Sequence, residues 1–121
     1  MVRKAITIAP DKKLYLIEND WAIIMDLYHI IETADYYSNT SPKGFPWGER
    51  AGIDWNNQDI KMSERIKPIK ISDLQKYLTE VEKKISNFLL GTSDKDLLTN
   101  QDGFSKFFDS ILTKYLYLLR H

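Results

Sequence analysis

The two histidines, His29 and His121, are the side chains of this sequence that are best suited to chemistry. A neutral imidazole nitrogen is a good ligand for zinc, nickel or iron. On a helix, Asp26 and Glu32 would lie three residues to either side of His29. Carboxylates at that spacing can orient a metal-binding ring and raise its pKa. The pattern suggests a metal site, although a partly exposed histidine in a charged strip is the simpler interpretation of His29 taken alone.

His121 closes the stretch KYLYLLRH and also has two interpretations. A cation in the last turn of a helix is stabilised by the helix dipole. Alternatively, His121 is the first member of a His-x-x-x-His pair whose second member would follow the last residue. A catalytic zinc site normally takes three protein ligands, so the two histidines would need Asp26 or Glu32 as a third.

The patterns of several other sites are missing from the sequence. The absence of cysteine excludes a thiolate zinc site, a disulfide framework and a cysteine nucleophile. No nucleophile elbow is present, and the isolated Gly44 and Gly48 lack the Lys-Ser or Lys-Thr of a phosphate-binding loop. The aromatic stretch GFPWGERAGIDW would form a structural lid or line a pocket. The lid is favoured, because bulky aromatic side chains mostly supply buried area.

The stretch DWAIIMDLYHIIETADYYSN has helical periodicity, with apolar residues in two adjacent stripes. Asn19 or Asp20 is expected to cap its start, and Ser38 to lie at its end. Two stripes predict a helix that packs against more than one neighbour. The remaining narrow face is polar and carries Asp26, His29, Glu32, Thr33 and Tyr36.

Two further helices are predicted. One covers 72–90, where Ser72 and Gln75 form a capping box and Gly91 is expected in the left-handed conformation that ends many helices. The other covers 102–121. Its apolar stripe contains Phe104, Phe107, Phe108, Ile111, Leu112, Tyr115 and Leu119. Between them, TSDKDLLTNQ predicts a short turn or a half-formed helix.

Two regions have no clear periodicity. Residues 1–18 form an N-terminal arm that is expected to be a hairpin around Pro10, an arm lying on the bundle, or an extra leading turn of the first helix. Residues 40–71 form a long, aromatic-rich crossover loop. Connections beyond about 12–15 residues are usually functional or disordered, and the aromatic content argues against disorder. This loop is expected to pack over one end of the helices.

These elements predict an all-α fold, an up-down helical bundle formed by residues 1–121 as a single domain. Three helices are an awkward number, because the first and third are too apolar for a three-helix monomer. Either the N-terminal arm completes the core or a second chain does. The second case predicts a homodimer.

The charge balance bears on the class of partner. The sequence has 17 basic and 17 acidic side chains and a formal net charge of zero. Nucleic-acid-binding proteins usually have a basic excess or a basic stripe, so no nucleic-acid partner is expected. No stretch approaches the roughly 20 apolar residues of a membrane span, and no secretory signal is visible. A cytoplasmic protein without a membrane partner is expected.

Three stretches together resemble the DinB-like (YfiT-like) family of four-helix metalloproteins. WAIIMDLYHIIETADYY is similar to that family's helix with a tryptophan near its start and a histidine about two turns later. IKISDLQKYLTEVEKKISNFLLGTSDKDLL is similar to its middle amphipathic helix, and GFSKFFDSILTKYLYLLRH to the beginning of its closing helix. The resemblance covers roughly residues 19–121. The family's leading helix is missing or is replaced by residues 1–18.

The resemblance implies a divalent metal, such as zinc or nickel, held by three histidines at one end of a bundle. The first would correspond to His29 and the second to His121, while the third would fall past the last residue. Family members with an assigned activity act on small molecules as thiol-dependent transferases or isomerases, or as metal-dependent hydrolases, in which the metal polarises a thiol or water. The alternative is a non-catalytic helical bundle that acts through self-association or partner binding.

Overall fold

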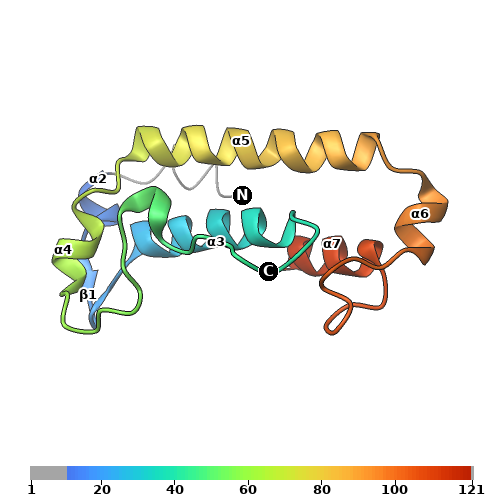
Figure 1. Cartoon of the computed structure of the whole chain (residues 1–121). Helices are drawn as coiled ribbons and strands as arrows, with labels where there is room; N and C mark the ends of the chain where they lie inside the picture. Colours follow the sequence, from blue (N-terminus) through green and yellow to red (C-terminus); the bar gives the residue numbers. More distant parts are fainter. Residues whose placement is uncertain (1–10, 121) are drawn as a thin grey trace. The chain divides into compact units, whose positions relative to one another are not determined.

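The computed structural model, drawn in Figure 1, describes residues 11–120. These residues form two compact units. Unit 1 contains residues 11–32 and 46–78, and unit 2 contains residues 33–45 and 79–120. The described chain is mostly helical, with one small two-stranded sheet. The expected all-α character is therefore confirmed at this level. The up-down bundle and the single domain over 1–121 stay predictions.

Unit 1 contains the short helix α2 (Asp11–Leu14), which lies in the predicted N-terminal arm, and a hairpin whose second strand lies where the sequence predicted the start of the first long helix. Strand β1 (Ile17–Glu18) pairs antiparallel with β2 (Trp21–Ala22). Asn19 and Asp20 between them have positive φ angles of 51° and 59°. Two residues with positive φ form the tight hairpin turn that matches strand twist. The prediction that one of them caps the first helix is therefore wrong.

The first long helix, α3 (Ile23–Tyr37), starts directly after this hairpin. Its apolar stripes are buried in unit 1 only in part, through Ile24, Leu27, Tyr28 and Ile31. Trp21 and Ile23 were also expected in the stripes but are 41% and 48% exposed, and Met25, which belongs to neither stripe, is buried. The predicted polar strip is only partly correct. Asp26 and His29 are exposed, whereas Glu32 and Thr33 are among the most deeply buried polar residues of the described chain.

The long connection after α3 is structured and contains two short helices in unit 1. These are the 3-10 helix η1 (Glu49–Ala51) and α4 (Met62–Ile66). The Tyr15 hydroxyl donates a hydrogen bond to the carbonyl of Ile69, just before helix α5 (Ile71–Leu90). The rest of the unit's apolar core consists of Leu14, Ala22, Ala51, Ile53, Ile66, Ile69, Leu74 and Tyr77.

Helix α5 follows its predicted limits closely, but its end differs from the expectation. Gly91 does not have a positive φ angle. Its amide donates to the Asn87 carbonyl at 3.1 Å, and the Thr92 hydroxyl donates to the Phe88 carbonyl at 2.7 Å. The threonine hydroxyl supplies a donor for a terminal carbonyl, so the left-handed glycine ending is not needed.

The half-formed helix predicted between the two long ones is α6 (Asp94–Thr99). Ser93 caps it by accepting a hydrogen bond from the Asp96 amide at 3.1 Å. A serine oxygen at this position satisfies one of the free amides of the first turn. Unit 2 therefore contains a short capped helix soon after the end of α5.

The third predicted helix is shorter than expected, because α7 covers only Ile111–Arg120. Ser110 accepts a hydrogen bond from the Thr113 amide at 3.1 Å and caps the start. Before it, the Asp102 carboxylate accepts from the Phe104 amide at 2.9 Å, and the Gly103 amide donates to the Thr40 carbonyl at 2.7 Å. These bonds hold 102–109 as turns, so the predicted helical stripe through Phe104, Phe107 and Phe108 is wrong.

Residues 1–10, which form most of the predicted N-terminal arm, and His121 lie outside the described residues. The described part of that arm contains α2 and β1. Within residues 11–120, no helix has the length and apolar character needed to cross a membrane.

Candidate functional site

The predicted metal ligands are not brought together within the described residues. His29 lies on α3 with an exposed side chain, and His121 is not described. Asp26 accepts a hydrogen bond from the Trp21 indole at 2.6 Å, and Glu32 points into the buried part of unit 1. Between residues 11 and 120, no three His, Asp or Glu side chains lie close enough to hold a metal ion. The metal site stays a prediction.

Glu32 is instead part of a buried hydrogen-bonded cluster in unit 1. One carboxylate oxygen, Oε1, accepts from the Tyr28 hydroxyl at 2.7 Å and from the Gly48 amide at 2.6 Å. Burial is the main cause that raises the pKa of Tyr28, and the hydrogen bond to Glu32 raises it further. A buried carboxylate requires such donors, because transfer of a charge out of water is costly. The cluster fixes the loop at Gly48 against α3.

Gly48 is suited to this position by its missing side chain. Its φ angle is 81°, in the left-handed region that favours glycine. A Cβ atom there would lie 2.2 Å from the carbonyl oxygen of Ile53 and 2.9 Å from the Trp55 ring nitrogen. The sequence contained one local signal for the cluster, the i, i+4 spacing of Tyr28 and Glu32. Gly48 itself is 16 residues from Glu32, so no periodicity could reveal its part.

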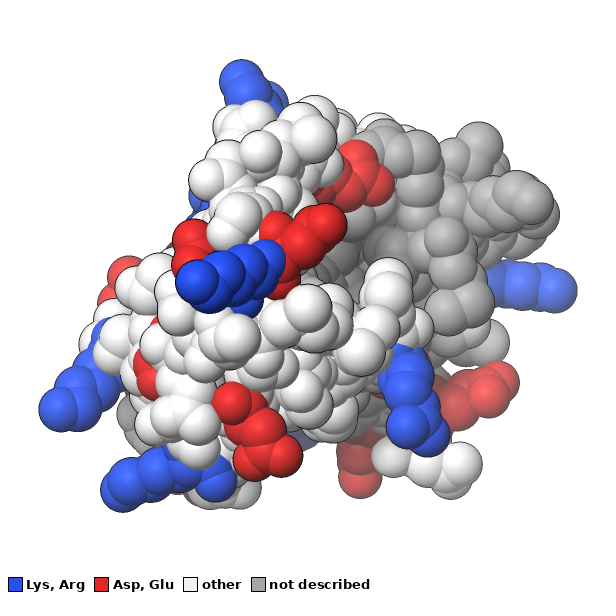
Figure 2. Space-filling model, turned by 90° about the vertical axis from the view of Figure 1, so that its right-hand side faces the viewer, with Lys and Arg blue, Asp and Glu red and all other residues white. Residues whose placement is uncertain are grey.

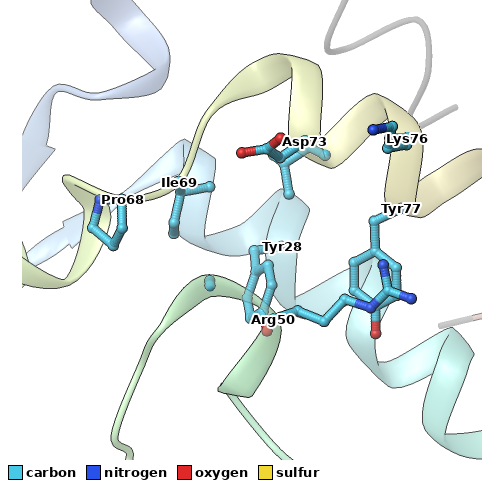
Figure 3. Close-up of a pocket in the computed structure, with 9 residues that line it drawn as sticks. Tyr28, Arg50, Pro68, Ile69, Asp73, Lys76 and Tyr77 are labelled. Atoms are coloured by element: carbon cyan, nitrogen blue, oxygen red, sulfur yellow. The ribbon is translucent and has the colours of Figure 1, made fainter.

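A pocket of about 180 Å³ lies beside the start of α5 in unit 1 (Figure 3). Its buried surface comes from side chains that are almost inaccessible to solvent, among them Tyr28, Ile69 and Leu74. Its rim carries three exposed charged residues, Arg50, Asp73 and Lys76. The described residues that line it are Tyr28, Arg50, Ala51, Pro68, Ile69, Asp73, Leu74, Lys76 and Tyr77. The pocket therefore combines an apolar floor with a charged rim.

Arg50 is held at this rim by an aromatic ring. Its guanidinium carbon lies 4.2 Å from the centroid of the Tyr77 ring, a cation–π arrangement that favours a fixed position. Figure 3 shows the Arg50 side chain running from η1 past Tyr28 to the Tyr77 ring, with Asp73 and Lys76 on the same stretch of α5. The aromatic stretch of the sequence therefore contributes, through Arg50 and Ala51, to a pocket as well as to the core.

Unit 2 presents a different candidate, an exposed apolar surface on α7. We call it the α7 face and define it as Phe107, Phe108, Leu116, Tyr117 and Leu119. Four of these residues line an open groove of about 700 Å³, together with Thr113 and Arg120. Leu119 lies one helical turn from Leu116 and extends the same face.

Figure 2 shows the molecule from the α6 end of Figure 1. Among the described residues on this side, charged side chains are scattered over uncharged surface and form no patch of one sign.

The α7 face is fixed from behind by aromatic contacts and by a buried lysine. The rings of Phe108 and Tyr117 lie 5.7 Å and 5.5 Å from the ring of Tyr37 at the end of α3. On the other side of α7, the buried Lys114 forms an ion pair with Asp102 and donates to the Asn39 carbonyl at 2.9 Å. These contacts attach α7 to the rest of unit 2.

Comparison of the chain with protein-family models, with curated proteins and with solved structures finds no match.

Proposed function

We propose that this protein acts by self-association and that the α7 face pairs with the same face of a second copy. One observation carries the proposal: Phe107, Leu116 and Leu119 are 70%, 50% and 84% exposed although they are large and apolar. Monomeric soluble proteins rarely expose contiguous apolar patches larger than a few hundred Å². Covering this surface would therefore be favourable.

The size of the α7 face suits a dimer. With roughly 200 Å² for a large side chain, the exposed parts of Phe107, Leu116, Tyr117 and Leu119 amount to about 490 Å² per chain. Two copies would then bury about 1,000 Å² of apolar surface. Because apolar atoms make up about 57% of an ordinary interface, this corresponds to a total near 1,700 Å². Stable specific interfaces bury about 1,200–2,000 Å².

The chemistry of the face favours a second copy over a charged partner. An apolar surface is its own complement, as a two-fold interface requires. Among residues 11–120, Arg120 is the only charged residue that lines the groove, and the formal net charge of the chain is zero. Long-range repulsion between copies is therefore small. The groove residues Thr113, Leu116, Tyr117 and Arg120 follow the i, i+3, i+4, i+7 spacing of a helix face that packs on another helix.

Sedimentation velocity over about 1–100 μM, the range of moderate affinities, tests the proposal. The wild-type chain is expected to shift from monomer to dimer as its concentration rises. Leu116→Asp is expected to be monomeric throughout, because it places a charge in the centre of the face, and to keep its helical circular dichroism.

Leu98→Asp is the matched control, since Leu98 on α6 is 60% exposed but does not line the groove. This variant is expected to dimerise like the wild type. A wild-type chain that stays monomeric over the whole range, or an unchanged dimer of Leu116→Asp, would show that the proposal is wrong.

A further inference from the structure

The pocket beside α5 is independent of the α7 face, because it belongs to unit 1 and shares no residue with the groove of unit 2. We propose that this pocket binds a small organic monocarboxylate with a ring-sized apolar body. The floor of the pocket would hold the apolar body, and Arg50 and Lys76 at the rim would bind the carboxylate.

The floor of the pocket matches the apolar part of such a ligand. Ile69 and Leu74 are 3% and 2% exposed, and the buried Tyr28 and Ala51 complete this surface. The volume of about 180 Å³ corresponds to roughly six water molecules in the liquid. One six-membered ring fits this space, and a ligand of drug size does not. Ligand pockets typically combine such a lining with a few placed polar groups.

The rim matches the charged part of the ligand. Arg50 presents a planar guanidinium with five N–H donors, which suits a carboxylate better than a point charge does. The Tyr77 ring at 4.2 Å fixes this group before the ligand arrives, and such preorganisation lowers the entropy lost on binding. Because the guanidinium has five donors, it can bind a ligand while it keeps contacts within the protein.

The charges of the lining select a monoanion. Among the described residues that line the pocket, Arg50 and Lys76 are the two cations and Asp73 is the single anion. Glu32 does not line it, and its carboxylate accepts hydrogen bonds from Tyr28 and Gly48. An organic cation would meet two like charges, and a dianion would be opposed by Asp73. A ligand with one negative charge would neutralise the one excess positive charge of these three side chains.

Isothermal titration and amide chemical shifts of the full chain, with benzoate as the probe, test this site. Benzoate is expected to bind and to shift amides of residues around Ile69, Leu74 and Tyr77. Benzamide has the same shape without the charge, and it is expected to bind at least about tenfold more weakly, because a charge-assisted hydrogen bond contributes about that factor. Benzylammonium is expected not to bind.

Arg50→Gln is expected to weaken benzoate binding by about tenfold or more, and Lys76→Gln by a smaller factor. Lys70→Gln is the control, since Lys70 is exposed and does not line the pocket. If Arg50→Gln does not fold, Lys76→Gln and the comparison of the three probes on the wild-type chain still decide the question. Leu116→Asp is expected to bind benzoate like the wild type, so this site can be right or wrong independently of the dimer.

Three results would overturn the proposal. One is the absence of benzoate binding up to about 10 mM, a concentration well above the highest dissociation constant expected for such a site. Another is equal binding of benzoate and benzamide. The third is an unchanged benzoate affinity in a folded Arg50→Gln variant.

Discussion

At the scale of single residues, Gly48 is the glycine at which an added Cβ atom would meet the closest contact. It has a left-handed φ angle, and the space that a Cβ atom would need is occupied by the Ile53 carbonyl and the Trp55 ring. Its amide also donates to the buried Glu32. Three requirements therefore meet at one residue, and the conformation and the contacts both exclude a side chain.

We predict that Gly48→Ala lowers the free energy of unfolding by about 3 kcal/mol or more, the sum of the left-handed strain and the steric conflict. Urea unfolding followed by circular dichroism measures it. Gly52→Ala is the matched control, because Gly52 has a φ angle of 66° and open space at the Cβ position. The control is expected to lose only the strain, about 1 kcal/mol. Equal losses in the two variants would contradict the steric argument.

The raised pKa of Tyr115 predicts that stability depends on pH in the alkaline range. Burial raises the pKa of Tyr115 to about 12, and the nearby charge of Asp102 adds to this. Between pH 10 and 12 the unfolded chain loses the tyrosine proton while the native chain keeps it. The unfolded state then binds fewer protons, so stability is fully present below about pH 10 and falls as the pH rises towards 12.

The free energy of unfolding is expected to fall by about 1.4 kcal/mol per pH unit in this range because of Tyr115. Tyr115→Phe is expected to remove this contribution. At neutral pH the substitution is expected to be neutral or stabilising, because the buried Tyr115 hydroxyl has no hydrogen-bond partner among the described residues. Unfolding experiments at several pH values between 9 and 12 measure both effects. Parallel pH curves for the two proteins would contradict the prediction.

At the scale of elements, a buried ion pair is one of the contacts that position α7. Lys114 is 1% exposed and binds Asp102 and the Asn39 carbonyl, so it joins α7 to the turns before it and to the end of α3 within unit 2. Lys84 of α5 binds the same segment, with its ammonium 2.7 Å from the Asp35 carboxylate. Two lysines therefore fix the end of α3 in this unit.

We predict that Lys114→Met lowers the free energy of unfolding by about 3 kcal/mol, because it leaves the largely buried Asp102 without its ion-pair partner. The double variant with Asp102→Asn is expected to recover part of this loss, since the charge is then removed as well. Lys106→Met, at an exposed position, is the control and is expected to change stability by less than about 0.5 kcal/mol. A similar small effect for Lys114→Met would show that the pair contributes little.

At the scale of the whole molecule, the proposed dimer makes thermal stability depend on concentration. A chain that unfolds from a dimer to two monomers gains stability by mass action as its concentration rises. We predict that the melting temperature increases by about 3 °C for each tenfold rise. Leu116→Asp is expected to melt at one temperature at all concentrations. Calorimetry at two concentrations measures this, and a wild-type melting temperature that does not change would contradict it.

The sequence by itself determined the elements whose evidence is local. The 3.6-residue periodicity predicted the limits and the buried face of α5 and the existence of α3, because each turn of a helix depends on neighbours three and four residues away. It placed the start of α3 too early, at residues that pair in the hairpin. The capped turn that became α6 was visible for the same reason. Phe104, Phe107 and Phe108 also matched a helical stripe, but the bond from Gly103 to Thr40 holds them in turns.

Only the tertiary structure decided where the functional candidates lie. Glu32 belonged to a polar strip by its spacing, yet a glycine 16 residues away provides the amide that permits its burial. No motif of the sequence marks Lys114, yet a carbonyl 75 residues away accepts its hydrogen bond in the interior. The pocket gathers residues from α3, η1 and the start of α5. Such contacts depend on which distant segments of the chain lie side by side, and local periodicity does not predict this.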